Sequence, residues 1–276
     1  MYRYLAVITA FLRPRHLASS FLGLVLAASA CGPSTSGNPN PDADGGNGAD
    51  ADLTPAAATM YVHTPDTLYT IDDQSFDLVL VGSFGLTGGD QITDLAVTPD
   101  GNVYGITFDK LFRVDRGTGL ATFVADVPGI VNVGMTFLND GTLLATDKAG
   151  GVRQINPNTG AVTEVGTFGG GFATAGDLVA VADGTMFAIS DEGPVGDELT
   201  NNVLLTVNTT TGAATSVGQI GYGQVFGVAV ANNAVYAFTE PGEVIEINPA
   251  DGSGQLVRTH AQMFWGAGVT PLVVVE

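Results

Sequence analysis

The chain from residue 59 to residue 276 consists of short apolar runs separated by turn residues. The runs are rich in Val, Ile, Leu, Thr, Phe and Tyr, and Gly, Asn and Asp lie between them. This pattern is typical of strands and turns, and no segment has the 3.6-residue periodicity of a long amphipathic helix. The pattern therefore predicts an all-β domain over residues 59–276.

Two phrases recur in alternation along this domain. The first is an apolar run, a short Asp-Gly or Asn-Asn turn and a second run, as in AVTPDGNVYGITF and AVADGTMFAISD. The second carries a Gly in its turn, as in INPNTGAVTEVG. Each phrase predicts a β-hairpin, so each repeat predicts four antiparallel strands, A to D. Corresponding residues of strand B recur every 40–49 residues, which is close to the spacing of propeller blades: Tyr61, Tyr104, Leu144, Phe187 and Tyr236.

The two ends of the domain predict a closed ring. The first repeat lacks strand A, and the last residues, FWGAGVTPLVVVE, match a lone strand A. We predict a five-bladed β-propeller in which residues 269–275 pair innermost with the strand that contains Tyr61, so that no edge is left open. A β-sandwich of the same hairpins is the alternative. Small residues at the start of strand A either let the inner strands approach near the axis or bend them: Gly134, Gly227, Gly266 and Gly268.

The repeats resemble those of the secreted bacterial propellers of the YVTN and NHL kind. The phrases LYTIDDQSFDLVLVG and INPNTGAVTEVG carry the resemblance, which covers residues 60–270. It implies a propeller and a secreted bacterial protein. Repeats of this kind occur in binding proteins and in enzymes, so the resemblance does not identify an activity.

Residues 1–30 have the features of a secretory signal. Arg3, Arg13 and Arg15 precede an apolar stretch of about 14 residues, shorter than the ~20 that span a bilayer. The string ASAC resembles the lipobox of bacterial lipoproteins, although Ala28 stands where that family prefers Leu. The resemblance implies cleavage before Cys31 and acylation of its thiol, which would remove an otherwise exposed free thiol. A plain signal peptide with a chance cysteine is the alternative.

Residues 32–58 predict a flexible tether. The segment is rich in Gly, Pro, Asn, Asp and Ser and has one large apolar residue, Leu53, so it cannot bury enough surface to fold. About 27 such residues span on the order of 30 Å. We thus predict a signal peptide over 1–30, a tether over 31–58 that starts at lipidated Cys31, and the propeller over 59–276. The expected location is the cell envelope, at the outer membrane and facing the periplasm or the surface, with the protein a monomer.

Charge excludes one class of partner. The formal net charge is −19, and removal of residues 1–30 leaves six basic and 28 acidic residues, or −22. Such a surface repels nucleic acid and anionic lipid. Acidity of this kind also serves solubility, so it does not by itself indicate a cationic partner.

The irregular connections are expected to carry function. In a four-stranded meander the A–B and C–D turns lie on one face, the turn face, and the B–C and D–A connections lie on the other, the loop face. The turns here are short and uniform, so we place a binding surface on the loop face. Its predicted residues are Phe172, Asp191, Glu192, Asp197, Glu198, Tyr222, Phe264 and Trp265. The structural alternative is that the acids form turns and the aromatic rings fill spaces between blades.

Two acids are expected near the mouth of the central channel. Asp94 and Asp177 each stand seven residues before a turn glycine. With Glu240 as a further ligand or base they would form a calcium site, because Ca²⁺ takes 6–8 oxygen ligands. Such a site would resemble that of the calcium-bound lactonase propellers. No other cofactor is predicted.

Several motifs of common enzymes are absent from the sequence. There is no G-x-S-x-G elbow, Walker loop or Rossmann fingerprint, and His63 and His260 lack ligand-like spacing. We therefore predict a membrane-anchored binding module for a protein or a glycan rather than an enzyme. A calcium-dependent hydrolase and a structural envelope protein are the alternatives.

Overall fold

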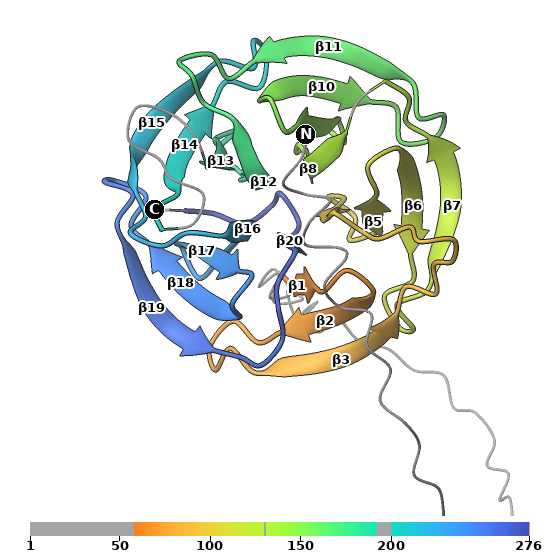
Figure 1. Cartoon of the computed structure of the whole chain (residues 1–276), viewed down its shortest axis with the longest axis horizontal. Coiled ribbons are helices and arrows are strands. Elements are labelled where there is room, and N and C mark those ends of the chain that lie inside the picture. Colours follow the sequence, from red (N-terminus) through yellow and green to blue (C-terminus); the bar gives the residue numbers. More distant parts are fainter. Residues whose placement is uncertain (1–57, 130, 192–199, 276) are drawn as a thin grey trace, which may run out of the picture. The chain divides into compact units, whose positions relative to one another are not determined.

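The described part of the chain forms five four-stranded antiparallel sheets around a common axis (Figure 1). The computed structural model describes residues 58–129, 131–191 and 200–275. None of these residues is in a helix, and no helix long and apolar enough to cross a membrane is found among them. The predicted signal peptide and most of the predicted tether, including Cys31, lie outside the described residues. The predicted all-β, five-bladed propeller is confirmed.

Each blade contains one inner strand, two middle strands and one outer strand. Listed from the axis outwards, blade 1 contains β20 (Gly266–Gly268), β1 (Met60–His63), β2 (Thr67–Ile71) and β3 (Leu78–Ser83); blade 2 contains β4 (Asp94–Val97), β5 (Val103–Ile106), β6 (Lys110–Val114) and β7 (Ala121–Asp126); and blade 3 contains β8 (Asn132–Phe137), β9 (Leu143–Asp147), β10 (Gly151–Ile155) and β11 (Val162–Thr167). Blade 4 contains β12 (Thr174–Ala180), β13 (Met186–Ser190), β14 (Val203–Val207) and β15 (Ala214–Gln219), and blade 5 contains β16 (Val225–Ala231), β17 (Ala234–Thr239), β18 (Glu243–Ile247) and β19 (Gly254–Thr259).

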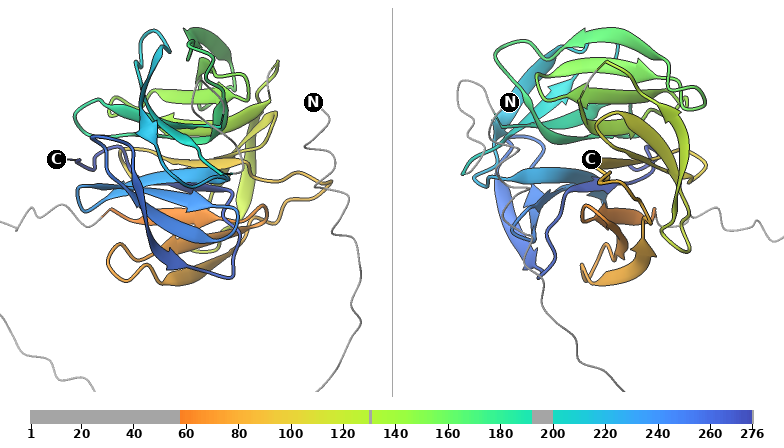
Figure 2. Two further views of the ribbon diagram at one scale, coloured as in Figure 1. Left: turned by 60° about the vertical axis from the view of Figure 1, so that its left-hand side comes forward. Right: turned by 45° about the vertical axis from the view of Figure 1, so that its right-hand side comes forward.

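Burial decreases from the axis to the rim. Strands β4, β8 and β12 are buried along their whole length, because both of their faces pack against neighbouring blades. The outer strands β3, β11 and β15 are exposed or half-buried throughout. Figure 2 shows from two further directions that the blades cover one another without any helical layer. The apolar core therefore lies between blades, which explains why the repeats are rich in β-branched and aromatic residues.

The ring is closed by the last strand of the domain. Strand β20 pairs with β1 in an antiparallel register in which Tyr61 lies opposite Gly268 and His63 lies opposite Gly266. The predicted closure is confirmed, but the predicted position of the closing strand, residues 269–275, is wrong. Those residues continue to the turn face, where the Val273 carbonyl accepts a hydrogen bond of 2.8 Å from the Ala182 N–H. Pro271, three residues after the end of β20, has no backbone N–H to donate, which limits further pairing.

All five outer strands carry a β-bulge at a valine. The register between the third and fourth strand of every blade shifts by one residue at Val81, Val124, Val165, Val217 or Val257. Bulges increase local twist and interrupt a free edge, so they protect the rim against edge-to-edge pairing. In blade 4 the bulge precedes Gly218, where a Cβ would lie 1.8 Å from the Asp251 carbonyl oxygen of blade 5. The repeated Val-Gly pair thus lets one blade touch the next.

The seam between the last and the first blade is built differently. Where the other third-to-fourth-strand turns have a glycine, blade 1 has Phe76, which keeps the same left-handed backbone with φ of 57°. Its ring packs on Tyr236 of blade 5 at 5.1 Å between centroids. Where Gly218 stands in blade 4, blade 5 has Arg258, which donates hydrogen bonds to the Ser75 carbonyl and the Asp77 carboxylate. Side chains therefore replace the close glycine contact at the seam.

We expect Phe76→Gly to destabilise the propeller by about 2 kcal/mol. Loss of a buried Phe costs about 3–5 kcal/mol, and relief of the left-handed backbone returns about 1–2 kcal/mol. The melting temperature should fall by about 4–8 °C. Thermal unfolding followed by circular dichroism measures this shift. Phe123→Ala, on an exposed ring of an outer strand, is the control and should stay within about 0.5 kcal/mol of the parent. A rise in the melting temperature of Phe76→Gly would mean that strain outweighs packing at the seam.

Candidate functional site

Five backbone N–H groups, one from the inner strand of every blade, converge on two carboxyl groups at the axis. Asp94 accepts hydrogen bonds from the N–H groups of Leu95, at 2.8 Å, and Met135, at 2.6 Å. Asp177 accepts three, and these come from the N–H groups of Leu178 (2.6 Å), Val228 (2.7 Å) and Ala267 (3.1 Å). These donors belong to β4, β8, β12, β16 and β20. Two side chains therefore connect all five blades.

At this level of the axis the other three blades have glycines, which leave room for the two carboxyl groups. The three blades without the acid have Gly134, Gly227 and Gly266 there, as the repeat alignment predicts. A Cβ on Gly134 would lie 2.0 Å from the Gly176 carbonyl oxygen. A Cβ on Gly266 would lie 2.6 Å from Asp94 Oδ1. The two carboxyl groups thus occupy the room that these glycines leave free, which supports the prediction that small residues allow close approach at the axis.

The carboxyl groups of Asp94 and Asp177 hydrogen-bond to each other and are both fully buried. Burial, with the neighbouring charge of Asp177, raises the pKa of Asp94 well above its usual value. Burial raises the pKa of Asp177 to about 8, although the hydrogen bond from Asp94 and the three N–H groups act in the opposite direction. Burial is the largest cause at both acids, so both carboxyl groups hold a proton to a higher pH than an exposed Asp does.

His63 lies beside this pair and is fully buried. Its Nδ1 donates to the Thr64 carbonyl at 2.9 Å, which leaves Nε2 as the unprotonated nitrogen. Nε2 has no hydrogen-bond partner among the described residues. Both Nε2 and Asp94 Oδ1 lie within 2.6 Å of the point that a Gly266 Cβ would occupy, so they are neighbours. Burial lowers the pKa of His63 to about 4, and the imidazole is neutral at physiological pH.

The structure brings together two of the three acids that were predicted to bind calcium. Glu240 is not part of the axial pair: its Oε2 accepts a hydrogen bond of 2.6 Å from Gln224 Nε2. Within residues 58–129, 131–191 and 200–275, no group of three or more His, Cys, Asp or Glu side chains is placed to hold a metal ion. All four oxygens of Asp94 and Asp177 already accept N–H groups, so the pair differs from the oxygen cage that Ca²⁺ prefers. A calcium ion there would need these bonds to rearrange.

The predicted aromatic residues of the loop face divide into two groups. Phe172, Tyr222 and Trp265 precede β12, β16 and β20 and are half-buried, so each presents part of its ring to solvent. Phe264 is fully buried between Phe238, at 5.5 Å between ring centroids, and His260, at 5.7 Å. Its expected place on the binding surface is therefore corrected, because its ring fills the core of the seam between blades 5 and 1.

Sequence reasoning missed three apolar side chains on the loop face. Phe108 lies in the connection between β5 and β6, Val131 in that between β7 and β8, and Met263 in that between β19 and β20. They are 40%, 54% and 42% exposed, respectively. The residues at these places differ in type from blade to blade, so the repeat pattern gave no signal for them. Together with Phe172, Tyr222 and Trp265 they make the loop face partly apolar.

The acids that end the second strands serve mainly as turn residues. Asp147 accepts the N–H groups of Ala149 and Gly151, each at 2.9 Å, and pairs with Arg153. Asp191 is buried and its carboxylate pairs with Lys148 of the neighbouring blade. Glu192, Asp197 and Glu198 lie outside the described residues. The acids with a described position thus support the turn interpretation, and Asp191 ties blade 4 to blade 3.

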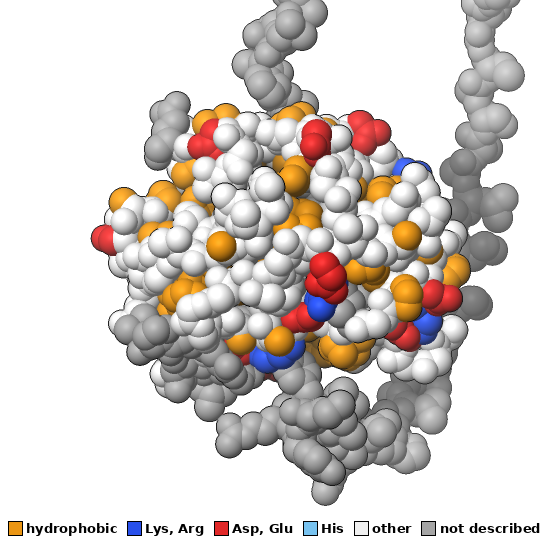
Figure 3. All heavy atoms as spheres, turned by 90° about the horizontal axis from the view of Figure 1, so that it is seen from above, with side chains coloured by type: hydrophobic (Ala, Val, Ile, Leu, Met, Phe, Trp, Pro, Cys, Tyr) orange, Lys and Arg blue, Asp and Glu red, His pale blue; other side chains and the backbone are white. Residues whose placement is uncertain are grey.

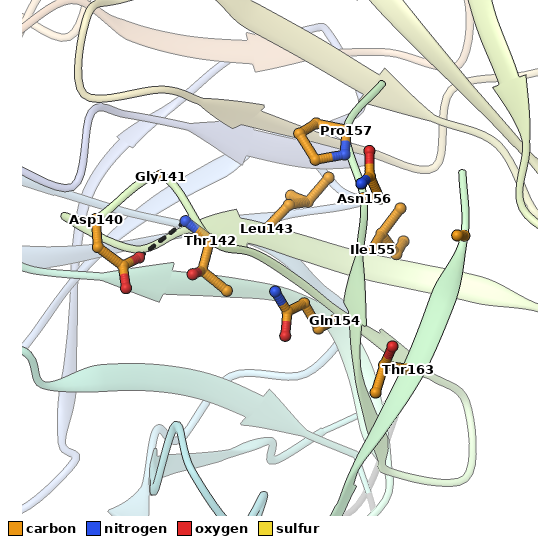
Figure 4. A pocket seen from close by; sticks show the side chains of 10 residues that line it. Asp140, Gly141, Thr142, Leu143, Gln154, Ile155, Asn156, Pro157 and Thr163 are labelled. Atoms are coloured by element: carbon orange, nitrogen blue, oxygen red, sulfur yellow. Dashed lines mark hydrogen bonds between the residues drawn. The ribbon is translucent and has the colours of Figure 1, made fainter. Parts of the chain in front are cut away.

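A shallow pocket of about 350 Å³ lies on the turn face of blade 3 (Figure 4). Its polar walls come from Thr142, Gln154, Asn156 and Thr163, and Leu143 and Ile155 form its floor. Asp140 accepts a hydrogen bond from the Thr142 N–H at 2.9 Å and so belongs to the turn itself. The pocket contains no buried unpaired polar atom, and it is open enough to be filled with water.

Comparisons with known proteins agree with this architecture. No protein-family model matches the chain, and no curated protein matches it. A chain of the nidogen–laminin complex superimposes with a TM-score of 0.53 at 12% identity, over 78% of this chain and 98% of that chain. A symmetrical protein from work on de novo evolutionary emergence gives 0.53 at 15% identity, over 78% and 99% of the two chains. The likeness extends to the fold alone. A propeller fold by itself does not identify an activity.

Proposed function

We propose that this protein is a lipid-anchored, extracytoplasmic binding module that recruits a protein or a glycan through its loop face. The observation that carries the proposal is the gathering of half-exposed apolar side chains on that face: Phe108, Val131, Phe172, Tyr222, Met263 and Trp265. Aromatic residues and Met are the residue types that recognition surfaces use most. The turn face carries short hairpin turns of similar form in all blades.

The chemistry of the axis supports binding rather than catalysis. Asp94 and Asp177 are fully buried and use their oxygens to hold the five inner strands together. His63 is also buried, and its ring is turned toward the axis rather than toward the loop-face surface. A rigid ring with its acids committed to structure is suited to present a surface, as in other propellers. The nidogen–laminin chain of the same fold was seen in a complex of two proteins.

The proposal includes a lipid anchor at Cys31 and a location at the outer membrane. The lipobox-like string that ends at Cys31 and the tether of residues 31–58 support attachment to the bacterial envelope, at the outer membrane. Stable anchoring needs more than one acyl chain, which a diacylated lipoprotein cysteine supplies. Cys31→Ser should abolish incorporation of labelled palmitate and move the protein from the membrane fraction to the soluble fraction.

Site-specific photo-crosslinking in intact cells tests the binding surface. A photoreactive residue placed at Phe172 on the loop face should give a discrete cross-linked partner, and one placed at Thr142 on the turn face should not. Trp265→Ala combined with Tyr222→Ala should reduce the yield at Phe172 by at least about fivefold, since truncation of an aromatic hot spot costs more than 1 kcal/mol. If the partner is a glycan, the same pair of substitutions should abolish binding on a glycan array. Equal yields from both faces, with no effect of the double variant and no glycan signal, would contradict the proposal.

A further inference from the structure

The exposed apolar residues of the rim are concentrated on three consecutive blades. Eleven large hydrophobic side chains are exposed in the described chain, and six of them lie on or next to the outer strands of blades 5, 1 and 2. We call these six the apolar half-rim: Leu256 and Val257 of β19, Val79 and Leu80 of β3, Leu120 before β7, and Phe123 in β7. The two most exposed are Leu80 and Val79, at 63% and 60%.

The fold does not require apolar residues at these places. The positions of Val79 and Leu80 in β3 correspond to Thr163 and Glu164 in β11 and to Thr215 and Ser216 in β15. No large apolar residue of β11 or β15 is among the eleven exposed ones. Figure 3 looks at the rim from the side of β11, and hydrophobic side chains appear there as separate spots. Blades 3 and 4 thus act as an internal comparison, in which the same strand carries a polar surface.

The described chain enters the propeller in blade 1, the middle one of these three blades, beside the second strand from the axis. The described chain begins at Ala58, immediately before β1 of blade 1, and blade 1 stands between blades 5 and 2 in the ring. The tether between Cys31 and Ala58 spans on the order of 30 Å if it is flexible. A tether of this length, anchored at Cys31 as proposed, allows the half-rim to reach the membrane.

Charge limits the kind of surface that the half-rim fits. Arg258, next to Val257, forms an ion pair with Asp77, two residues before Val79, and the whole chain has a formal net charge of −19. Anionic lipid would be repelled by such a protein, whereas a zwitterionic surface would not. Exposed Leu, Val and Phe side chains gain free energy when they enter the boundary between headgroups and acyl chains.

We infer that the apolar half-rim rests on the zwitterionic lipid surface to which the chain is tethered. The inference rests on the lipid anchor of the proposed function and adds an orientation to it. The ring stands on its edge, with blades 5, 1 and 2 at the membrane and blades 3 and 4 in solvent. The loop face is then accessible from the side, close to the membrane, where it can meet a partner in the same envelope layer.

Vesicle flotation of an unacylated chain tests this orientation separately from the anchor. The mature chain from residue 31 with Cys31→Ser is mixed with phosphatidylcholine vesicles, and with vesicles that also contain phosphatidylglycerol. We expect it to float with the former and less with the latter. A variant matched to blade 4, with Val79→Thr, Leu80→Ser, Phe123→Ser and Leu256→Ser, should partition at least tenfold less. Trp265→Ala combined with Tyr222→Ala should float like the parent, because those side chains lie on the loop face.

The outcomes separate the half-rim from the other possibilities. No flotation of the parent beyond that of the half-rim variant would overturn the inference. Sedimentation equilibrium of the same samples without lipid identifies a second copy as the occupant. A dimer that the half-rim variant dissociates would also overturn it. If vesicles bind through the half-rim but cells do not acylate Cys31, then the anchor fails and the lipid-facing rim stands.

Discussion

Asp177→Ala is expected to lower the free energy of unfolding by about 3 kcal/mol or more, because three buried N–H groups lose their acceptor and each such loss costs about 1–3 kcal/mol. These donors belong to Leu178, Val228 and Ala267, in three different blades. Removal of a buried carboxyl group that shares a proton offsets part of the loss, which is why the expected value lies at the lower end. For a domain of this size the melting temperature should fall by about 6–12 °C.

Formate should restore much of this loss, because it carries the carboxylate that the substitution removes. Urea unfolding at pH 6, with and without 100 mM formate, gives the two free energies. Asp115→Ala is the matched control, since Asp115 accepts the N–H groups of Gly117 and Thr118 in an exposed turn. It should cost about 1 kcal/mol or less and should not respond to formate. If Asp177→Ala were no worse than this control, the axial carboxyl groups would not hold the blades together.

Stability is expected to fall as the pH rises from about 6.5 to 8. The pKa of Asp177 is raised by burial to about 8 and that of Asp94 is raised as well. A group whose folded pKa is raised contributes stability that is complete below its unfolded pKa, near 4, and is lost as the pH rises through its folded pKa. Between those values the folded state binds more protons, so the free energy of unfolding decreases by about 1.4 kcal/mol per pH unit for each proton.

His63 works in the opposite direction over a lower range. Its folded pKa is lowered by burial to about 4, so its contribution to stability is lost as the pH falls from about 6.5 to 4. Between pH 4 and 6.5 the change at His63 offsets the change at one of the two acids, and above pH 6.5 nothing at the axis opposes the fall. Asp94→Asn should flatten the curve, because it removes one titrating group and the charge interaction that couples the pair. Urea unfolding at half-unit steps of pH measures both slopes, and equal slopes in the parent and in Asp94→Asn would refute the assignment.

The number and order of the blades could be predicted from the sequence, because every hairpin carries its own turn signal. The Asp-Gly turn before Val103 and the Thr-Gly turn before Ala161 fix the hairpins locally, and their 40–49-residue recurrence fixes the repeat. The first repeat lacks its inner strand and the last segment is a spare one, which predicts that the two ends pair and close the ring. The axial acids could also be recognised from the sequence, because Asp94 and Asp177 each stand seven residues before a turn glycine.

What the sequence did not contain is the set of contacts across the axis. The convergence of five N–H groups on two carboxyl groups depends on how the ring closes, and no local pattern encodes it. The apolar run that follows Val269 looked like the closing strand, whereas the short glycine-rich segment before it fits the crowded axis. Phe264 and Trp265 are adjacent aromatic residues, and only packing decides that the first is buried and the second half-exposed.

Strand β20 has a consequence for how the molecule is made. Residues 266–268 supply the innermost strand of blade 1, although residues 60–83 provide the other three. During synthesis, blade 1 cannot be completed until β20 has been made, after all the strands of blades 2 to 5. Until then the inner edge of β1 has no partner strand, so the ring closes only after the other four blades have been made.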